Sequence, residues 1–434
     1  MEKTDEAHRL TDKELAALEK RIASVYKQAR DDMQDQVTAY FESFAKRDEE
    51  MKELIGTVVN GKEWTEQDYK QWRLAQIGRG KRFEAMRDKL AERMTKANEV
   101  AVSYVNDATP GIYSLNRNYA AYTIEQVAGD VGFNLWDEQT VKRLIVEQPD
   151  LMPYYPEKKA VKRGIDLAYG KKQITASVTS GILQGKSIKG LADDLQTRIP
   201  TMNRDSAVRT ARTAVTGAQN AGRQDSFEAA AKMGIKVRKR WIATKDNRTR
   251  HDHGIADGQT VDYDQPFIVG GEELMYPGDA SGSPWNIYNC RCTIRTVEKD
   301  EIEAEPRQMR VRDPATGRNV LVTEMTYSEW EKWVQSRQYN DIIGAETANG
   351  LKVQSISVHT IDRAGERGVS QSAALDALCH PLHIGDITVD EQGRRSQRFI
   401  GTDATVNINP DTGNIATVWK TGKNTRKKYE DGET

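Results

Sequence analysis

Apolar residues recur every three or four positions through residues 15–44, which is the spacing of one face of an α-helix. This stripe predicts a long amphipathic helix near the start of the chain. A second stripe over residues 69–101 predicts a partner helix, although Gly78 and Gly80 favour a break within it. Because each apolar stripe needs a partner to bury it, we expect residues 1–150 to form a helical scaffold or docking region.

Further helices are predicted in the middle of the chain. The apolar positions over residues 174–199 have a helix-turn-helix rhythm that Pro200 stops. The next helix is predicted over residues 203–233, with Asn203 as its N-cap and Gly234 at its C-terminal end. The middle of the chain is therefore expected to be mainly helical.

Three other features divide the chain. Two prolines within residues 150–156 predict a boundary before a second region, residues 151–298. Alternating apolar and polar residues at 237–244 predict a strand inside that region. The charged stretch that follows predicts a linker, residues 299–350, with a short aromatic helix whose tryptophans dock against a neighbour.

The last region, residues 351–434, has the pattern of a small α+β domain. A helix is predicted over residues 370–379, and the turn sequence at 409–413 predicts a hairpin. Four strands are predicted, at residues 384–389, 397–400, 404–408 and 415–419. The expected fold is therefore multidomain: mainly α at the start, a small α+β region in the middle and an α+β domain at the end.

Composition narrows the class of protein. The chain has 434 residues, 30% of them charged and 37% hydrophobic, which suits a polar, helix-rich protein of several domains. Its formal net charge of −1 hides an excess of basic residues over positions 158–250. These residues either contact nucleic acid or form a solvated face that pairs with acidic neighbours.

Cysteine usage and apolar runs bear on the compartment. The three cysteines are an odd number with no secretory signal, so we expect no disulfide framework and a reducing environment. No apolar run approaches the length of a membrane span, so we expect no membrane partner.

Side chains that can bind a metal ion or form buried hydrogen bonds are concentrated in residues 241–292. Four of them offer the nitrogen and sulfur ligands that a tetrahedral zinc site needs: His251, His253, Cys290 and Cys292. A single residue separates the two cysteines, whereas structural zinc sites usually have two to four. The alternative is a loop-rich core in which polar side chains hydrogen-bond one another: Asp246, His253, Asp279 and Arg291.

Four short sequence motifs, called words below, occur one after another in this stretch: W-x-A-T-x-D from Trp241, R-x-x-H from Arg250, Y-P-G-D from Tyr276 and N-C-R-C from Asn289. Together they resemble the phage Mu F-like (MuF) head morphogenesis domain, and R-T-A-R-T and Q-N-A-G-R upstream extend the likeness. His253 stands at the family's histidine, whereas His251 replaces a more usual proline. The resemblance implies a minor head protein of a tailed phage, located in the virion inside the capsid near the portal and assembled in the host cytoplasm. It also implies portal, major head and scaffold proteins and packaged DNA as partners.

Words in the last region carry a second resemblance. His-x3-Arg followed by Glu-Arg-Gly begins at His359, Arg-Phe-x-Gly begins at Arg398, and Thr-x-Trp-x-Thr begins at Thr417. Their order and spacing resemble the phage-associated nuclease domains grouped with barnase, EndoU, colicin and RelE. The resemblance implies a RelE/barnase-like nuclease module of about eighty residues.

Metal-free RNA cleavage needs an acid and a base, and cations that stabilise the phosphate as charge develops on it. His359 is the candidate acid/base, Glu366 orients its neighbours, and Arg363, Arg367 and Arg398 are candidate phosphate ligands. Three further candidates bind the phosphate or stack on a base: Thr417, Trp419 and Thr421. Basic residues in the tail would add affinity for nucleic acid: Lys420, Lys423, Arg426, Lys427 and Lys428.

Two functions are therefore expected together. The first is a minor capsid protein, and the second is an RNase toxin, working without a cofactor and delivered with the genome. A toxin requires protection of the producing cell, so an immunity protein is an expected partner. The alternative is a purely structural head protein whose last domain binds packaged nucleic acid without cleaving it. The alternative for residues 359–367 is a helix-capping cluster of ion pairs with no catalytic role.

Overall fold

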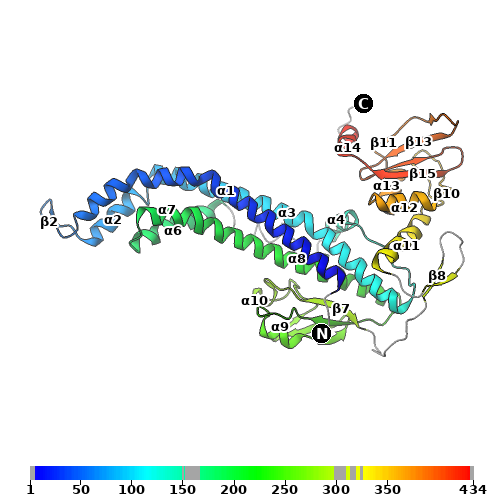
Figure 1. Ribbon diagram of the computed structural model, residues 1–434, viewed down its shortest axis with the longest axis horizontal. Coiled ribbons are helices and arrows are strands. Elements are labelled where there is room, and N and C mark those ends of the chain that lie inside the picture. Colours follow the sequence, from blue (N-terminus) through cyan, green and yellow to red (C-terminus); the bar gives the residue numbers. More distant parts are fainter. Residues whose placement is uncertain are drawn as a thin grey trace.

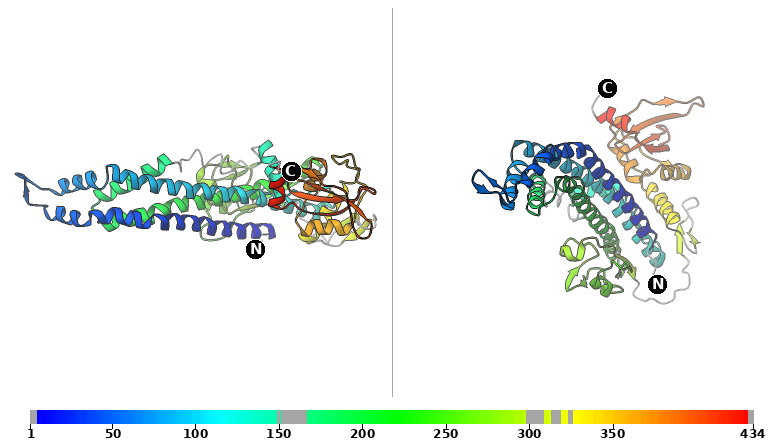
Figure 2. Two further views of the ribbon diagram at one scale, coloured as in Figure 1. Left: turned by 90° about the horizontal axis from the view of Figure 1, so that it is seen from above. Right: turned by 60° about the vertical axis from the view of Figure 1, so that its left-hand side comes forward.

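The computed structural model describes residues 5–148, 151, 167–297, 309–312, 319–322 and 326–430. Three long helices, α1 (Glu6–Glu53), α3 (Lys81–Ala128) and α8 (Ile199–Lys232), lie side by side as an elongated arm (Figures 1 and 2). Among the described helices, none combines the length and the apolar character that crossing a bilayer requires.

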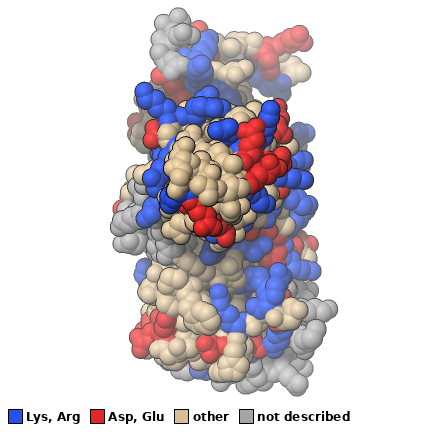
Figure 3. Space-filling model, turned by 90° about the vertical axis from the view of Figure 1, so that its left-hand side faces the viewer, with Lys and Arg blue, Asp and Glu red and all other residues tan. Residues whose placement is uncertain are grey.

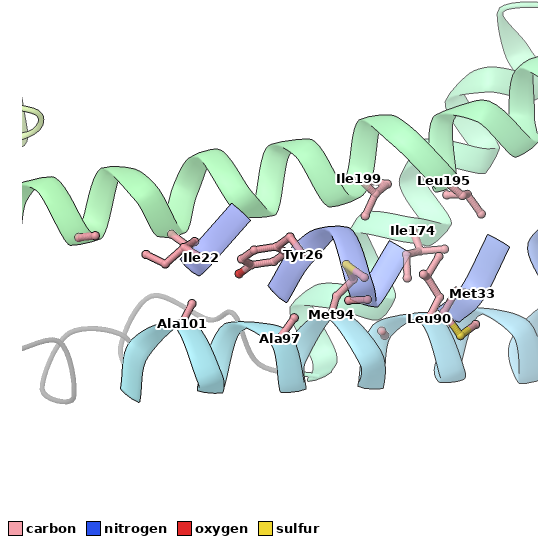
Figure 4. Close-up of a cluster of buried hydrophobic side chains, with 14 of the residues drawn as sticks. Ile22, Tyr26, Met33, Leu90, Met94, Ala97, Ala101, Ile174, Leu195 and Ile199 are labelled. Carbon is pink, nitrogen blue, oxygen red and sulfur yellow. The ribbon is translucent and has the colours of Figure 1, made fainter. Parts of the chain in front are cut away.

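The apolar stripes meet inside this arm. Ile22 and Tyr26 of α1 face Met94 and Ala97 of α3, and Ile199 of α8 closes the layer (Figure 4). The long first helix predicted from the apolar spacing is confirmed, because its stripe is the buried face of α1. Since α8 packs on α1 and α3, one core extends across the expected boundary near residue 150. Of the predicted boundary, residues 150 and 152–156 lie outside the described residues.

The tip of the arm contains the predicted glycine break. Helix α2 (Glu66–Gln76) ends before Gly78, and α3 starts after Gly80, whose φ of 91° favours glycine. The short elements at this end are β1 (Val58–Val59), β2 (Lys62–Glu63), α6 (Leu167–Leu183) and α7 (Ile188–Asp193). Seen end-on, basic and acidic side chains are interspersed over the tip (Figure 3). Of the basic excess predicted over residues 158–250, the basic residues at positions 158–166 lie outside the described residues.

Two predictions for the middle helices are wrong. Helix α7 continues through a π-helical turn, Asp194–Arg198, into α8, so Pro200 does not stop the helix. Pro200 lies directly after the π-helical turn, at the start of α8, where the irregular backbone of that turn accommodates its missing N–H. Asn203 is not the N-cap but a buried residue inside α8. Gly234, at φ 85° just beyond α8, is confirmed as the helix stop.

A small β-rich unit packs against the end of α8. The predicted strand is confirmed as β3 (Arg238–Ile242), which lies antiparallel between β4 (Thr260–Asp262) and β7 (Thr293–Val297). Its other elements are α9 (His251–Ala256), β5 (Phe267–Val269), β6 (Glu272–Leu274) and α10 (Pro284–Ile287). The buried Trp241 contacts Phe267 edge-on, with ring centroids 5.4 Å apart.

Part of the expected linker is ordered structure. Strands β8 (Met309–Arg312) and β9 (Asn319–Val322) pair, and α11 (Tyr327–Asn340) is longer than the aromatic helix predicted. Trp330 is fully buried, and its indole N–H donates to Glu125 of α3 at 2.6 Å. The prediction that the tryptophans dock against a neighbour is confirmed.

The last domain is a sheet with two helices, α12 (Val358–Glu366) and α13 (Gln371–Cys379), on one side and α14 (Lys423–Glu430) at one end (Figure 1). The strand order is β10-β15-β14-β13-β11, with β12 also paired to β13, and β10 alone runs parallel to its neighbour. The elements are β10 (Ser355–Ile356), α12 (Val358–Glu366), α13 (Gln371–Cys379), β11 (His383–Ile384), β12 (Thr388–Val389), β13 (Arg395–Ile400), β14 (Ala404–Ile408), β15 (Asn414–Lys420) and α14 (Lys423–Glu430). The predicted helix at 370–379 and the hairpin turn at 409–413 are confirmed, whereas the strand predicted at 384–389 is two short strands. The α+β class expected for this region therefore holds.

Candidate functional site

One face of α8 carries buried polar side chains, and this face holds the motif region in place. The Asn220 amide nitrogen donates to the carbonyl oxygens of Pro277 at 3.0 Å and Cys292 at 3.1 Å. Its oxygen accepts from the backbone N–H of Ile294 at 3.0 Å. One buried side chain therefore ties both the Y-P-G-D and the N-C-R-C words to the helix.

Arg223, one turn further along α8, joins four elements. Its guanidinium donates two hydrogen bonds to Asp5, at 2.6 and 2.8 Å, one to Asn116 at 3.0 Å and one to the Ile294 carbonyl at 2.9 Å. Asp5 is also the N-cap of α1. Burial alone would raise the pKa of Asp5, but the adjacent Arg223 outweighs burial and holds this pKa below 3.8.

Two glycines permit the close packing around α8. A Cβ at Gly222 would lie 2.4 Å from the carbonyl oxygen of Tyr113, so α3 and α8 could not approach as they do. Gly278, in the Y-P-G-D turn, has φ 82°, and a Cβ there would lie 2.9 Å from the Gly217 nitrogen. The glycines of these words are therefore required by backbone contact.

The N-C-R-C loop is also held by the first two words, W-x-A-T-x-D and R-x-x-H. Arg291 makes a two-pronged ion pair with Asp246, at 2.6 and 2.7 Å, which lowers the pKa of Asp246. The Thr244 hydroxyl donates to the Arg291 carbonyl at 2.7 Å, and Arg250 donates to the Tyr288 carbonyl. The expected polar core exists in part, because Asp246 and Arg291 pair.

Asp279 and Lys239 hold the Y-P-G-D turn instead of joining that pair. Asp279 accepts from the backbone N–H groups of Met275 at 2.8 Å and Ser281 at 2.9 Å. Lys239 is fully buried, and its ammonium donates to the Met275 carbonyl at 2.9 Å and to Gln224 at 3.1 Å. Burial lowers the pKa of Lys239 to about 8.

Three of the four predicted metal ligands converge. His253 Nδ1 lies 3.6 Å from Cys290 Sγ and 3.4 Å from Cys292 Sγ, and all three residues are buried. The hydrogen bond between the two sulfurs raises the pKa of Cys290 and lowers that of Cys292. His251 is not part of this cluster: two residues from His253, it points off the opposite side of α9, and its side chain is 87% exposed. Its inclusion as a ligand is therefore corrected.

Comparison with known proteins identifies the segment that contains this architecture. Residues 172–295 match the family model of Phage Mu protein F like protein. The matched segment runs from α6 to β7, and it includes the polar face of α8, all four words and the cysteine–histidine cluster. The last domain lies outside the match.

Two relatives extend the comparison. Minor head protein GP7 of Bacillus phage SPP1 is 27% identical over 266 residues, which are 59% of this chain and 80% of GP7. NAD(+)--arginine ADP-ribosyltransferase EFV of Enterococcus faecalis (strain ATCC 700802 / V583) is 32% identical over 137 residues, but the chain spans only 28% of that enzyme. No solved structure gives a significant match.

Outside the Phage Mu F-like segment, the sheet of the last domain gathers three predicted residues. Arg398 and Thr417 are both in register with Asn407 of the central strand β14, so their side chains share one face. The Arg398 guanidinium lies 5.4 Å from the ring centroid of Trp419. Cation, hydroxyl and aromatic ring therefore lie together on this face.

Helix α12 packs on β15 and carries a second set of predicted residues. The Thr360 hydroxyl donates to the Ala416 carbonyl at 3.1 Å, and Arg367 donates to the Val418 carbonyl at 2.8 Å and the Thr417 hydroxyl at 3.2 Å. The helical spacing places three predicted residues on one exposed face of α12: His359, Arg363 and Glu366. Arg367 is thus the link between the helix set and the sheet set.

The remaining predicted residues have other surroundings. The Thr421 hydroxyl donates to the Gly401 carbonyl at 2.8 Å and lies 2.9 Å from that of Thr405, so it supports the end of the sheet. Lys420 ends β15, and the other basic candidates lie on the exposed helix α14: Lys423, Arg426, Lys427 and Lys428.

Several partners of the motif region were missed from the sequence. Asp5 lies 218 positions before Arg223, and Asn116 lies 107 positions before it. His8 Nδ1 lies 2.7 Å from the Gln219 amide nitrogen. No local spacing links such distant residues, although the N-cap pattern around Asp5 could have marked the start of α1.

Proposed function

We propose that this chain is a minor head protein of a tailed phage, built into the capsid interior near the portal. The similarity to minor head protein GP7 over 80% of that protein carries the proposal. The Phage Mu F-like match also supports it, and the matched residues 172–295 contain the buried contacts that fix the motif region to the arm.

The shape of the chain suits an assembly role. The elongated arm offers a long exposed surface, while polar contacts at one end fix the β-rich unit to α8 (Figure 2). Portal, major head and scaffold proteins are the proposed partners, with packaged DNA as a further contact. Assembly would take place in the host cytoplasm, and the finished protein would reside in the virion.

A stop codon early in the gene tests this role in the phage that encodes the chain. We expect fewer infectious particles from a non-suppressing host, because heads would form without a component. Supplying the full-length gene in trans is the control and should restore the yield. A normal yield without the protein would count against a role in head assembly.

We further propose that the last domain is a metal-independent ribonuclease, carried as a toxin and delivered with the genome. The supporting observation is the set of residues along β15, where Arg367 contacts Thr417 and Arg398 faces Trp419. Cationic side chains there suit a phosphate, and the ring suits a base. His359 would act as the acid/base, and an immunity protein would protect the producing cell.

The ribonuclease proposal is tested with the full chain, host RNA and EDTA. We expect His359→Ala to slow cleavage by about 10²- to 10⁴-fold, the usual effect of losing a general acid or base. His380→Ala is the matched control, because His380 is exposed in the same domain and pairs with Asp376. Intact RNA with the wild-type chain would reject the ribonuclease, and RNA binding without cleavage would support the structural alternative.

A further inference from the structure

The His253, Cys290 and Cys292 cluster has two features of an ion site. Its three ligand atoms lie within 4.8 Å of one another, and their side chains are shielded from solvent, at 2%, 2% and 3% exposure. The second feature is the His253 ring, whose Nδ1 faces both sulfurs.

The separations fit a tetrahedral ion. With Zn–S near 2.3 Å and Zn–N near 2.05 Å, nitrogen and sulfur ligands of one ion lie about 3.5 Å apart. The observed distances from His253 Nδ1 to the two sulfurs are 3.4 and 3.6 Å. Thiol hydrogen bonds have similar lengths, but Nδ1 has one lone pair and accepts one thiol proton. A metal ion instead uses that lone pair and both thiolates at once.

The surroundings also suit thiolate ligands. The backbone N–H of Cys292 donates to Cys290 Sγ at 3.4 Å, which places a positive dipole against that sulfur. Arg291, between the two cysteines, directs its charge outward to Asp246. Thiolate and imidazole together favour zinc among common divalent ions.

We propose that His253, Cys290 and Cys292 bind one zinc ion, with water as the fourth ligand. The ion would join α9 to the start of β7, where the β-rich unit is mostly loop. Because zinc would bind the folded site and not the unfolded chain, its binding would stabilise this unit.

Metal content of the full-length protein, purified with zinc and then dialysed, tests the proposal. We expect about one equivalent of zinc by mass spectrometry, falling below about a tenth in His253→Gln and in Cys292→Ser. His251→Gln and Cys379→Ser are matched controls, because His251 is exposed and Cys379 lies in the last domain; both should keep the metal. Zinc below a tenth of an equivalent in the wild type, or unchanged zinc in Cys292→Ser, overturns the proposal.

A spectroscopic measurement covers the case in which the site variants fail to fold. Cobalt(II) replaces zinc in the wild-type chain, and thiolate ligands should give a sulfur-to-cobalt charge-transfer band in the near ultraviolet. Cys379→Ser should keep the band, since that cysteine is not in the cluster. A cobalt spectrum without the band would show that the cysteines do not bind metal, and would overturn the proposal.

Discussion

Replacing Arg223 with methionine is expected to lower the free energy of unfolding by about 3–5 kcal/mol, the usual cost of breaking a buried ion pair. The variant loses both hydrogen bonds to Asp5 and leaves that carboxylate without its cation. It also leaves the Ile294 carbonyl and the Asn116 oxygen without this donor. Urea unfolding followed by circular dichroism measures the effect.

Two further variants separate the stability lost with the ion pair from any stability lost by changing an arginine of α8. Arg209→Met changes the same residue type on the same helix, but Arg209 is exposed, so its effect should be within about 0.5 kcal/mol. Asp5→Asn keeps an N-cap for α1 while removing the charge, so adding it to Arg223→Met should recover part of the loss. Equal losses from Arg223→Met and Arg209→Met would contradict this explanation.

Asn220→Ala is expected to be nearly as damaging, at about 3–5 kcal/mol. The shorter side chain leaves the Pro277 and Cys292 carbonyls and the Ile294 N–H without the partner that ties them to α8, and each orphaned buried group costs about 1–3 kcal/mol. The motif region should loosen first. Hydrogen exchange in residues 272–297 should therefore become faster than in α1.

Asn340→Ala provides the comparison for this variant. Asn340 is exposed at the end of α11, so its replacement should leave both stability and exchange close to those of the wild type. If exchange in residues 272–297 were the same in Asn220→Ala as in the wild type, Asn220 would not be the contact that holds the motif region.

Local patterns predicted the helices and the hairpin, and non-local packing explains the errors. The stripe at residues 15–44 is periodic, and helices bury periodic stripes, so α1 could be predicted. Pro200 is ambiguous by itself, because the same residue stops one helix or occupies the first turn of another. The continuous helical path through α7 depends on burial of Leu191 and Leu195 against the arm.

The motifs of the site could be recognised in the sequence, but the arrangement of their side chains in space could not be predicted from it. The order of the four words indicated one compact region, and the structure places Asp246 against Arg291 and His253 against both cysteines. The motif marked His251 as a departure from the family pattern, but only the helix direction shows that its side chain points away from that of His253. The partner of Arg223 was beyond prediction because Asp5 lies at the far end of the chain.

The central claim is that the chain is a component of phage heads, and the protein content of purified heads tests it most directly. Heads from the phage that encodes the chain would be separated on a density gradient, digested and examined by quantitative mass spectrometry. The account predicts peptides from the arm and from the Phage Mu F-like segment, at a constant ratio to the portal protein through the head fractions. Heads that carry DNA and infect normally but contain none of these peptides would contradict it.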